Sequence, residues 1–267
     1  MKYRQPAVAG KFYPLSAVEL RHQLASFFAE HSPVNFIPKA LIVPHAGYFY
    51  SGAIAAKAYQ LLENHECEFR RIALLGPSHH IALHTCAVPE DDLFITPLGE
   101  ITIDKAAIEQ LLALGLATSS DSAHHWEHSL EVQLPFLQYC LDDFTLVPLV
   151  VGQCSPQQVM QLIAYLRREQ NTLVVVSSDL SHYHPYAEAK IIDQQTCQQI
   201  EQYQTPLIAE QACGCHAING LLTYAERENW QIDPVIYANS GDVLAAHQGT
   251  EVDNEQEVVG YASFVLY

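Results

Sequence analysis

Three short apolar runs of the sequence each end a few residues before a histidine. The runs cover 41–43, 72–75 and 173–176, and the histidines that follow them are His45, His79 and His182. Histidine is the commonest metal ligand in proteins and also a general acid or base near neutral pH. One such histidine would carry little information, but three in equivalent positions predict a shared site.

The local sequence indicates how some of these side chains are presented. Pro44 fixes a backbone angle before His45, and Gly47 permits a sharp turn after it, so a stiff loop presents the imidazole. A histidine that only hydrogen-bonds to nearby backbone would fit this position equally well. His79 is followed by His80. Because adjacent loop residues point in different directions, we expect only one of the two to face the site.

Asp179 and His182 lie three residues apart after the third run and can share one face of a turn. We expect His182 to act as a general acid or base that Asp179 orients. An aspartate in this position is also a common helix N-cap, which is the competing interpretation.

A Cys-Gly-Cys-His sequence begins at Cys213 and precedes a predicted helix. A thiol at a helix N-terminus has a lowered pKa, and its thiolate binds metals. The run is too short for a structural zinc site, but Cys213 could supply one ligand to a site that distant histidines complete. Cys215 could compete for the same metal. Two buried core thiols are the competing interpretation.

A second cluster of histidines and acids covers 124–131. Two of its histidines are four residues apart, but the serines upstream are typical of a loop, so we do not expect a separate metal site here. Glu127, His128 and Glu131 are expected around the shared site instead. Asp242 is a further candidate for this lining, although a loop or a helix cap fits it equally well.

Helical and strand-like segments alternate along the whole chain. Helices are predicted over 17–30, 52–62, 104–114, 128–140, 156–169, 186–203 and 214–227. Strands are predicted over 40–43, 72–75, 145–151, 173–176, 235–239 and 260–265. This alternation predicts one α/β domain over 1–267, with a central mixed, largely parallel sheet flanked by helices. Ligands of such sheets bind outside the carboxyl ends of strands, which is where the three histidines fall.

Single residues mark several helix ends. Ser16, Asp104 and Ser155 precede predicted helices as N-caps, and Gly115 follows one as its C-terminal stop. Pro135 lies inside a predicted helix and indicates a kink or an early stop.

The composition narrows the class of protein. The 267 residues include 13 basic and 30 acidic ones, for a formal net charge of −17. A chain this acidic repels phosphate groups, which argues against nucleic acid and anionic membranes as partners. Seven scattered cysteines, without a secretory signal or a long apolar stretch, indicate a reducing cytoplasm. Signatures of serine hydrolases and of nucleotide-binding enzymes are absent from the sequence.

The ordered motifs PHAGYFYSG, LGPSHH, EHSLEVQLPF, VVSSDLSHY and CGCHAINGLL resemble the Memo family, over essentially the whole chain. That family is similar in fold to class III extradiol ring-cleaving dioxygenases, which are non-haem iron enzymes. The resemblance implies an α/β domain with a metal held by His45, His79 and Cys213, with His80 as the alternative to His79. It places Asp179 and His182 beside the metal as acid–base groups.

The implied cysteine ligand distinguishes Memo-like chains from the dioxygenases, which use two histidines and a carboxylate. A thiolate favours softer or redox-active metals, so iron or copper is expected and zinc is the alternative. The implied function is that of a mononuclear metal site in an oxidoreductase or dioxygenase-related enzyme, acting on an unknown small molecule. The alternative is a non-catalytic module that binds a peptide or partner at a vestigial site. The family context also implies a radical S-adenosylmethionine protein as a partner.

Overall fold

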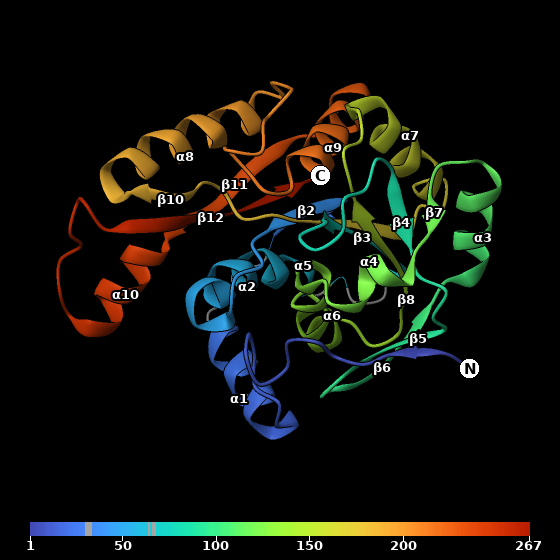
Figure 1. Cartoon of the computed structure of the whole chain (residues 1–267), viewed down its shortest axis with the longest axis horizontal. Coiled ribbons are helices and arrows are strands. Elements are labelled where there is room, and N and C mark those ends of the chain that lie inside the picture. The colour runs from blue at the N-terminus through green and yellow to red at the C-terminus, as the bar shows by residue number, and fades with distance from the viewer. Residues whose placement is uncertain (30–33, 64, 66–67) are drawn as a thin grey trace.

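The sheet predicted from the sequence runs through the whole molecule (Figure 1). The computed structural model describes residues 1–29, 34–63, 65 and 68–267. The strands are β1 (Tyr3–Arg4), β2 (Ala40–Val43), β3 (Arg71–Pro77), β4 (Cys86–Val88), β5 (Leu93–Thr96), β6 (Gly99–Ile103), β7 (Thr118–Ser119), β8 (Thr145–Val151), β9 (Thr172–Ser177), β10 (His182–Pro185), β11 (Ile232–Asn239) and β12 (Glu257–Leu266). Within the described residues they form one sheet of 12 strands.

The centre of this sheet is parallel and its margins are mixed. The main strand order is β1-β5-β6-β8-β3-β9-β2-β12-β10, and β11 pairs with β12 while β4 pairs with β7 and β8. Neighbours from β8 to β2 all run parallel, whereas β12 runs antiparallel to β2. The central strands are buried along nearly their full lengths. The predicted α/β class with a mixed, largely parallel sheet is therefore confirmed.

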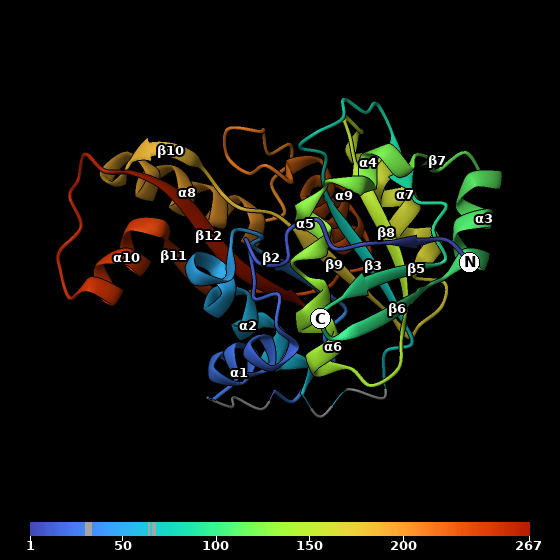
Figure 2. The same ribbon diagram turned by 60° about the horizontal axis from the view of Figure 1, so that its bottom comes forward.

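Helices cover both faces of the sheet (Figures 1 and 2). They are α1 (Ala17–Phe27), α2 (Ala53–Tyr59), α3 (Lys105–Ala113), α4 (Asp121–His125), α5 (His128–Glu131), α6 (Leu134–Cys140), α7 (Pro156–Leu166), α8 (Tyr186–Glu201), α9 (Cys215–Arg227) and α10 (Ser240–Gln248). The helices α2, α5 and α6 lie on one side of the central strands, and α7 packs with α9 on the other. No helix in the described part of the chain is both long and apolar enough to cross a membrane.

The predicted helix caps are confirmed. The side chains of Ser16 and Asp104 accept hydrogen bonds from backbone N–H groups in the first turns of α1 and α3. Ser155 forms a capping box with Gln158 at the start of α7. Gly115 has a φ of +68° after α3, a left-handed conformation that glycine adopts without strain.

One predicted helix differs from the structure, and several shorter elements were not predicted. The predicted helix over 128–140 is two short helices, α5 and α6, because Pro135 fits only in the first turn of the second. The prediction omits the helices α4 and α10 and the shorter strands β1, β4, β5, β6, β7 and β10. Asp242, for which a loop or a helix cap fits the sequence equally well, lies in the first turn of α10. Glu30, the predicted end of the first helix, lies outside the described residues, and so does Cys67.

The strand order brings the three predicted strand ends together. The strands β3, β9 and β2 are consecutive neighbours in the sheet and run parallel. Their carboxyl ends therefore meet at one edge, where they lead into His79, Asp179 and His45. This adjacency is what the sequence could not give, since it depends on which strands pair.

The N-terminal segment is fixed to the same edge by the buried carboxylate of Glu131. Its two oxygens accept hydrogen bonds from the backbone N–H groups of Ala7 (2.7 Å) and Val8 (2.9 Å) and from the hydroxyl of Tyr13 (2.7 Å). The Nη1 atom of Arg4 lies 2.8 Å from the same carboxylate, and both side chains are buried. Residues 4–13 are thereby held against α5.

Replacing Arg4 with methionine should lower the free energy of unfolding by about 3 kcal/mol, because it leaves the charge of Glu131 buried without its cation. The variant also loses the hydrogen bonds from Arg4 to the carbonyl oxygens of His124 and Glu127. Urea denaturation followed by circular dichroism measures the change. The exposed Arg21→Met on α1 is the control and should change stability by less than about 0.5 kcal/mol. Equal stability of both variants would contradict the role of this ion pair.

Candidate metal site

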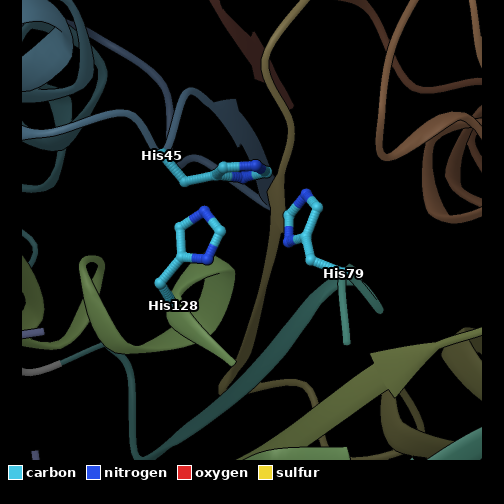
Figure 3. A group of neighbouring side chains, drawn as sticks. All are labelled: His45, His79 and His128. Carbon is cyan, nitrogen blue, oxygen red and sulfur yellow. The ribbon is translucent and has the colours of Figure 1, made fainter. Parts of the chain in front are cut away.

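Three histidine rings converge where these strand ends meet (Figure 3). His45 follows β2, His79 follows β3 and His128 begins α5. One ring nitrogen from each lies within 4.8 Å of the others, so a small inward movement of the side chains would let all three bind one metal ion. The ring centroids of His79 and His128 are 4.5 Å apart, and that of His45 lies 5.2 and 5.5 Å from them. His128, expected only around the metal, thus joins the predicted pair at the centre.

The hydrogen bonds of Ser177 fix which nitrogen of His45 faces the centre. The Ser177 hydroxyl lies 2.6 Å from the carbonyl oxygen of Ser129, which can only accept, so its single hydrogen is committed there. Toward the His45 Nδ1 atom, 3.0 Å away, the same hydroxyl must therefore accept. Nδ1 carries the ring hydrogen, and the lone pair of His45 is on Nε2.

The amide of Gln133 completes this arrangement. Its Nε2 atom donates to the carbonyl oxygen of Pro44 (2.8 Å) and to the Ser177 hydroxyl (2.8 Å). Its Oε1 atom accepts from the hydroxyl of Tyr59 (3.0 Å). All of these groups are buried and each has its partner, so the orientation of His45 is held on a saturated network.

His79 is held by a second, separate anchor. The carboxylate of Glu127 accepts from the backbone N–H and from Nδ1 of His79, both at 2.7 Å, and from the backbone N–H of Ser129 at 3.0 Å. Burial favours the neutral acid, but these hydrogen bonds outweigh it and hold the pKa of Glu127 well below its usual range. Because a carboxylate only accepts, Nδ1 of His79 is the donor and Nε2 is left for a ligand.

The surroundings favour the neutral form of two of the imidazoles, those of His45 and His128. Burial, followed by the nearby rings of His79 and His128, lowers the pKa of His45 well below its usual value. Burial and the neighbouring His79 lower the pKa of His128 to about 4. The ring of His128 also packs against Phe12 of the anchored N-terminal segment, with centroids 4.8 Å apart. Neutral rings keep the lone pairs that metal binding requires.

Cys213 lies beside this group, with its sulfur 3.3 Å from Nε2 of His45. The sulfur also accepts a hydrogen bond from the backbone N–H of Asp179 at 3.3 Å. Burial and the nearby Asp179 raise the pKa of the Cys213 thiol, so the lowered pKa expected from its position before α9 is wrong for the metal-free chain. The protonated sulfur has two acceptors for its one hydrogen, Nε2 of His45 at 3.3 Å and the carbonyl oxygen of Asp179 at 3.7 Å.

Asp179 and His182 do not form the expected pair. The Asp179 carboxylate accepts from the backbone N–H of His45 at 2.7 Å, and burial raises the pKa of Asp179 to about 7. His182 donates from Nδ1 to the carbonyl oxygen of Leu180 at 2.9 Å, which leaves its Nε2 as an acceptor. The prediction that Asp179 orients His182 is therefore wrong. Asp179 shapes the turn that carries His45, because that turn offers unpaired backbone N–H groups.

The other candidate residues lie outside the group of three histidine rings. His80 is exposed, with its ring 6.4 Å from that of His128, so His79 is the inward member of the pair. Cys215 is buried in the hydrophobic core. Glu131 anchors the N-terminal segment, as described above, and Asp242 forms the capping box of α10 with Asn239.

The sequence reasoning missed Ser177 and Gln133. Ser177 ends the apolar strand β9, and Gln133 stands among apolar residues between α5 and α6. A polar residue at a buried position needs a hydrogen-bond partner. The apolar sequence around Ser177 and Gln133 was therefore the signal that could have identified them. Which partner they bind follows only from the tertiary structure.

The three histidines fit a transition-metal ion. Two of them present Nε2 because a protein group holds the opposite nitrogen, which is the arrangement usual for metal-bound imidazole. Imidazole nitrogen, with a thiol alongside, suits zinc, copper and iron rather than magnesium or calcium. The set of donors does not by itself choose among these three metals.

Comparisons with known sequences match this chain over nearly its full length. A sequence profile of the Memo-like protein family matches residues 4–265. A MEMO1 family protein of Aquifex aeolicus is 35% identical over 275 residues, which cover 100% of this chain and 98% of the relative. One of Archaeoglobus fulgidus is 33% identical, over 98% of this chain and 99% of the relative. Among solved structures, the uncharacterized protein JW3007 from Escherichia coli K12 aligns with a TM-score of 0.49 and 12% identity, over 85% of this chain and 99% of that one.

Replacing Ser177 with alanine should release the tautomer of His45, because the acceptor for Nδ1–H is then gone. We expect ring ¹⁵N shifts to change from the pure Nδ1–H form to a mixture of both tautomers in the metal-free protein. Ser263→Ala is the matched control, since Ser263 is equally buried but bonds to the carbonyl oxygen of Ile54. An unchanged His45 spectrum in Ser177→Ala would show that another group sets the tautomer.

Replacing Glu127 with glutamine should weaken metal binding by about 10- to 100-fold, because the amide cannot accept from all three N–H donors at once. Titration of the metal-free protein with Co²⁺, followed by visible absorption, measures this loss. Glu109→Gln, on the exposed side of α3, should bind like the wild type. Equal Co²⁺ affinity in both variants would contradict the role of Glu127.

Proposed function

The chain belongs to the Memo-like protein family, and from this premise we propose that it is a metal-dependent oxidoreductase acting on a small molecule. A single metal ion would be held by His45, His79 and His128. The observation that carries the proposal is the convergence of three imidazole nitrogens within 4.8 Å, two of them oriented by separate buried anchors. Such preorganisation has no purpose in packing alone, because it leaves polar atoms of the rings facing one another.

Iron or copper is the metal we favour, with zinc as the alternative. Nitrogen donors bind all three, and the neighbouring Cys213 thiol adds a softer donor that suits redox-active ions. An iron or copper ion bound here would supply one-electron chemistry and would polarise a coordinated substrate. The protein's own groups then have to orient the substrate and move its protons.

We assign the transfer of protons to His182. Its Nδ1 is committed to the carbonyl oxygen of Leu180, and burial lowers its pKa, so the ring is neutral with Nε2 able to accept. Asp179, with a pKa near 7, can hold a second proton close to His45. We assign His182 as general base and Asp179 as the group that keeps the His45 turn in place.

Tyr183 is a candidate contact for the substrate. It follows His182 directly, its ring lies 5.8 Å from the imidazole, and 71% of its surface is exposed. It also has a left-handed φ of 59°, which is strained for a residue other than glycine. Such strain is found most often at functional sites. An exposed aromatic ring beside the proposed base would favour a substrate with an apolar or planar part.

The test is the metal content of anaerobically purified protein, measured by elemental mass spectrometry. We expect about one equivalent of iron or copper in the wild type and in the exposed control His22→Ala. His45→Ala and His128→Ala should both lose it. Circular dichroism establishes that each variant is folded.

The variant Cys213→Ser separates two ligand sets. Retention of the metal in Cys213→Ser and its loss in His128→Ala would support the three-histidine set. The opposite result would support the set implied by resemblance, in which Cys213 takes the third position. A wild type that takes up no metal on anaerobic reconstitution, or a His45→Ala variant that keeps it, would overturn the proposal. That outcome would favour the second function, recognition of a peptide or partner without catalysis.

A further inference from the structure

Two cysteines outside the histidine group have their sulfur atoms in contact. The Sγ atoms of Cys86 and Cys154 are 3.7 Å apart, and both residues are buried. Cys86 begins β4 and Cys154 lies just beyond the end of β8. They are separated widely in the sequence, so the fold has brought the two thiols together.

The backbone around the two cysteines sets this contact. Cys86 stands opposite Val151 in the antiparallel pairing of β4 with β8. Beyond β8, the N–H of Gly152 donates to the carbonyl oxygen of Thr85 at 3.1 Å, and the N–H of Gln153 donates to that of Leu83 at 2.8 Å. These bonds continue the pairing of the two segments up to Cys154.

The approach of these segments is so close that residue 152 must be glycine. A Cβ atom there would lie 2.3 Å from the carbonyl oxygen of Leu83, which no side chain tolerates. Tightly packed main chain therefore holds the two segments that carry these sulfur atoms in a fixed position relative to each other.

We propose that Cys86 and Cys154 form a redox site, in which the dithiol is oxidised reversibly to a disulfide. A disulfide bond is about 2.05 Å long, so the sulfurs must approach each other by less than 2 Å. With a hydroperoxide as oxidant, the Cys154 sulfur attacks one oxygen, the O–O bond breaks, and an alcohol or water leaves. The resulting sulfenic acid is attacked by Cys86, which forms the S–S bond and releases water.

The electrostatics of the pair agree with this order of events. The hydrogen bond with Cys86 lowers the pKa of Cys154, whereas the same contact and burial raise the pKa of Cys86. Cys154 is thus the better nucleophile and Cys86 the resolving thiol.

The redox site lies between the loop that follows His79 and the segment that leads from Cys213 into α9. Residues 79–86 connect His79 directly to Cys86. On the other side, the ring of His216 contacts the carbonyl oxygen of Cys154 through Nδ1 at 3.0 Å, and His216 follows Cys213 by three residues. A disulfide would therefore fasten the loop of His79 to the turn that supports the start of α9. This inference needs no bound metal and is independent of the proposed function.

The experiment uses the full-length chain, reduced and freed of metal by a chelator, and treated with equimolar hydrogen peroxide. Remaining thiols are alkylated, and the peptides are mapped by mass spectrometry without reduction. We expect one linked pair of peptides containing Cys86 and Cys154, lighter by two hydrogens and separated again by dithiothreitol. Cys140→Ser, which removes another buried thiol, should keep this link. Cys86→Ser should lack it and should leave Cys154 as a sulfenic acid that dimedone traps.

Two results would overturn the proposal. One is full alkylation of Cys86 and Cys154 in the oxidised wild type after unfolding, and the other is a disulfide only between Cys213 and Cys215. Because both are read in the wild type, a variant that fails to fold does not obscure the answer. Hydrogen exchange tests the connection to the loop, since amides of residues 79–85 should exchange at least tenfold more slowly in the oxidised protein. Unchanged exchange would contradict that connection.

Discussion

The buried negative charge of Glu127 is the constraint on which the geometry of the candidate metal site depends. A carboxylate in this position requires several N–H donors, and it obtains them from the backbone and ring of His79 and from the backbone of Ser129. Satisfying the charge therefore fixes the end of β3, the orientation of the His79 ring and the start of α5 in one step. Without it, the loop after β3 would have no reason to place His79 rather than His80 toward the centre.

The second buried acid, Glu131, extends this constraint to the chain terminus. It lies at the far end of the single-turn helix α5, and its partners are donors from residues 4 to 13. Phe12 is carried with this segment onto the face of His128. A helix of four residues has little intrinsic stability, so its place in the structure comes from these two carboxylates. In the cluster of histidines and acids over 124–131, Glu127 and Glu131 therefore serve to hold neighbouring segments in place.

The sequence predicted those features of the site that depend on neighbouring residues in the chain. The ends of apolar runs identified His45, His79 and Asp179 because parallel strands deliver their following residues to one edge. The caps of α1, α3 and α7 follow from short-range hydrogen bonding and were equally predictable. The roles of His128 and Asp179 depend on which strands are neighbours and on which donors remain unpaired, and neither property is local. The thiol of Cys213 shows the same limit, because the depth of its burial outweighs its place before a helix.

The two proposed ligand sets share His45 and His79 and differ in whether His128 or Cys213 is the third ligand. His45 lies next to both of these residues. Its Nε2 atom faces the sulfur of Cys213 at 3.3 Å, and its ring also lies 5.5 Å from that of His128. His45 and His79 are oriented by saturated hydrogen bonds, whereas His128 is placed by ring packing, and its Nδ1 is 3.6 Å from Glu127, beyond hydrogen-bond length. Two side chains of the candidate site are therefore fixed by hydrogen bonds, whereas the third member of the histidine group is positioned by ring packing alone.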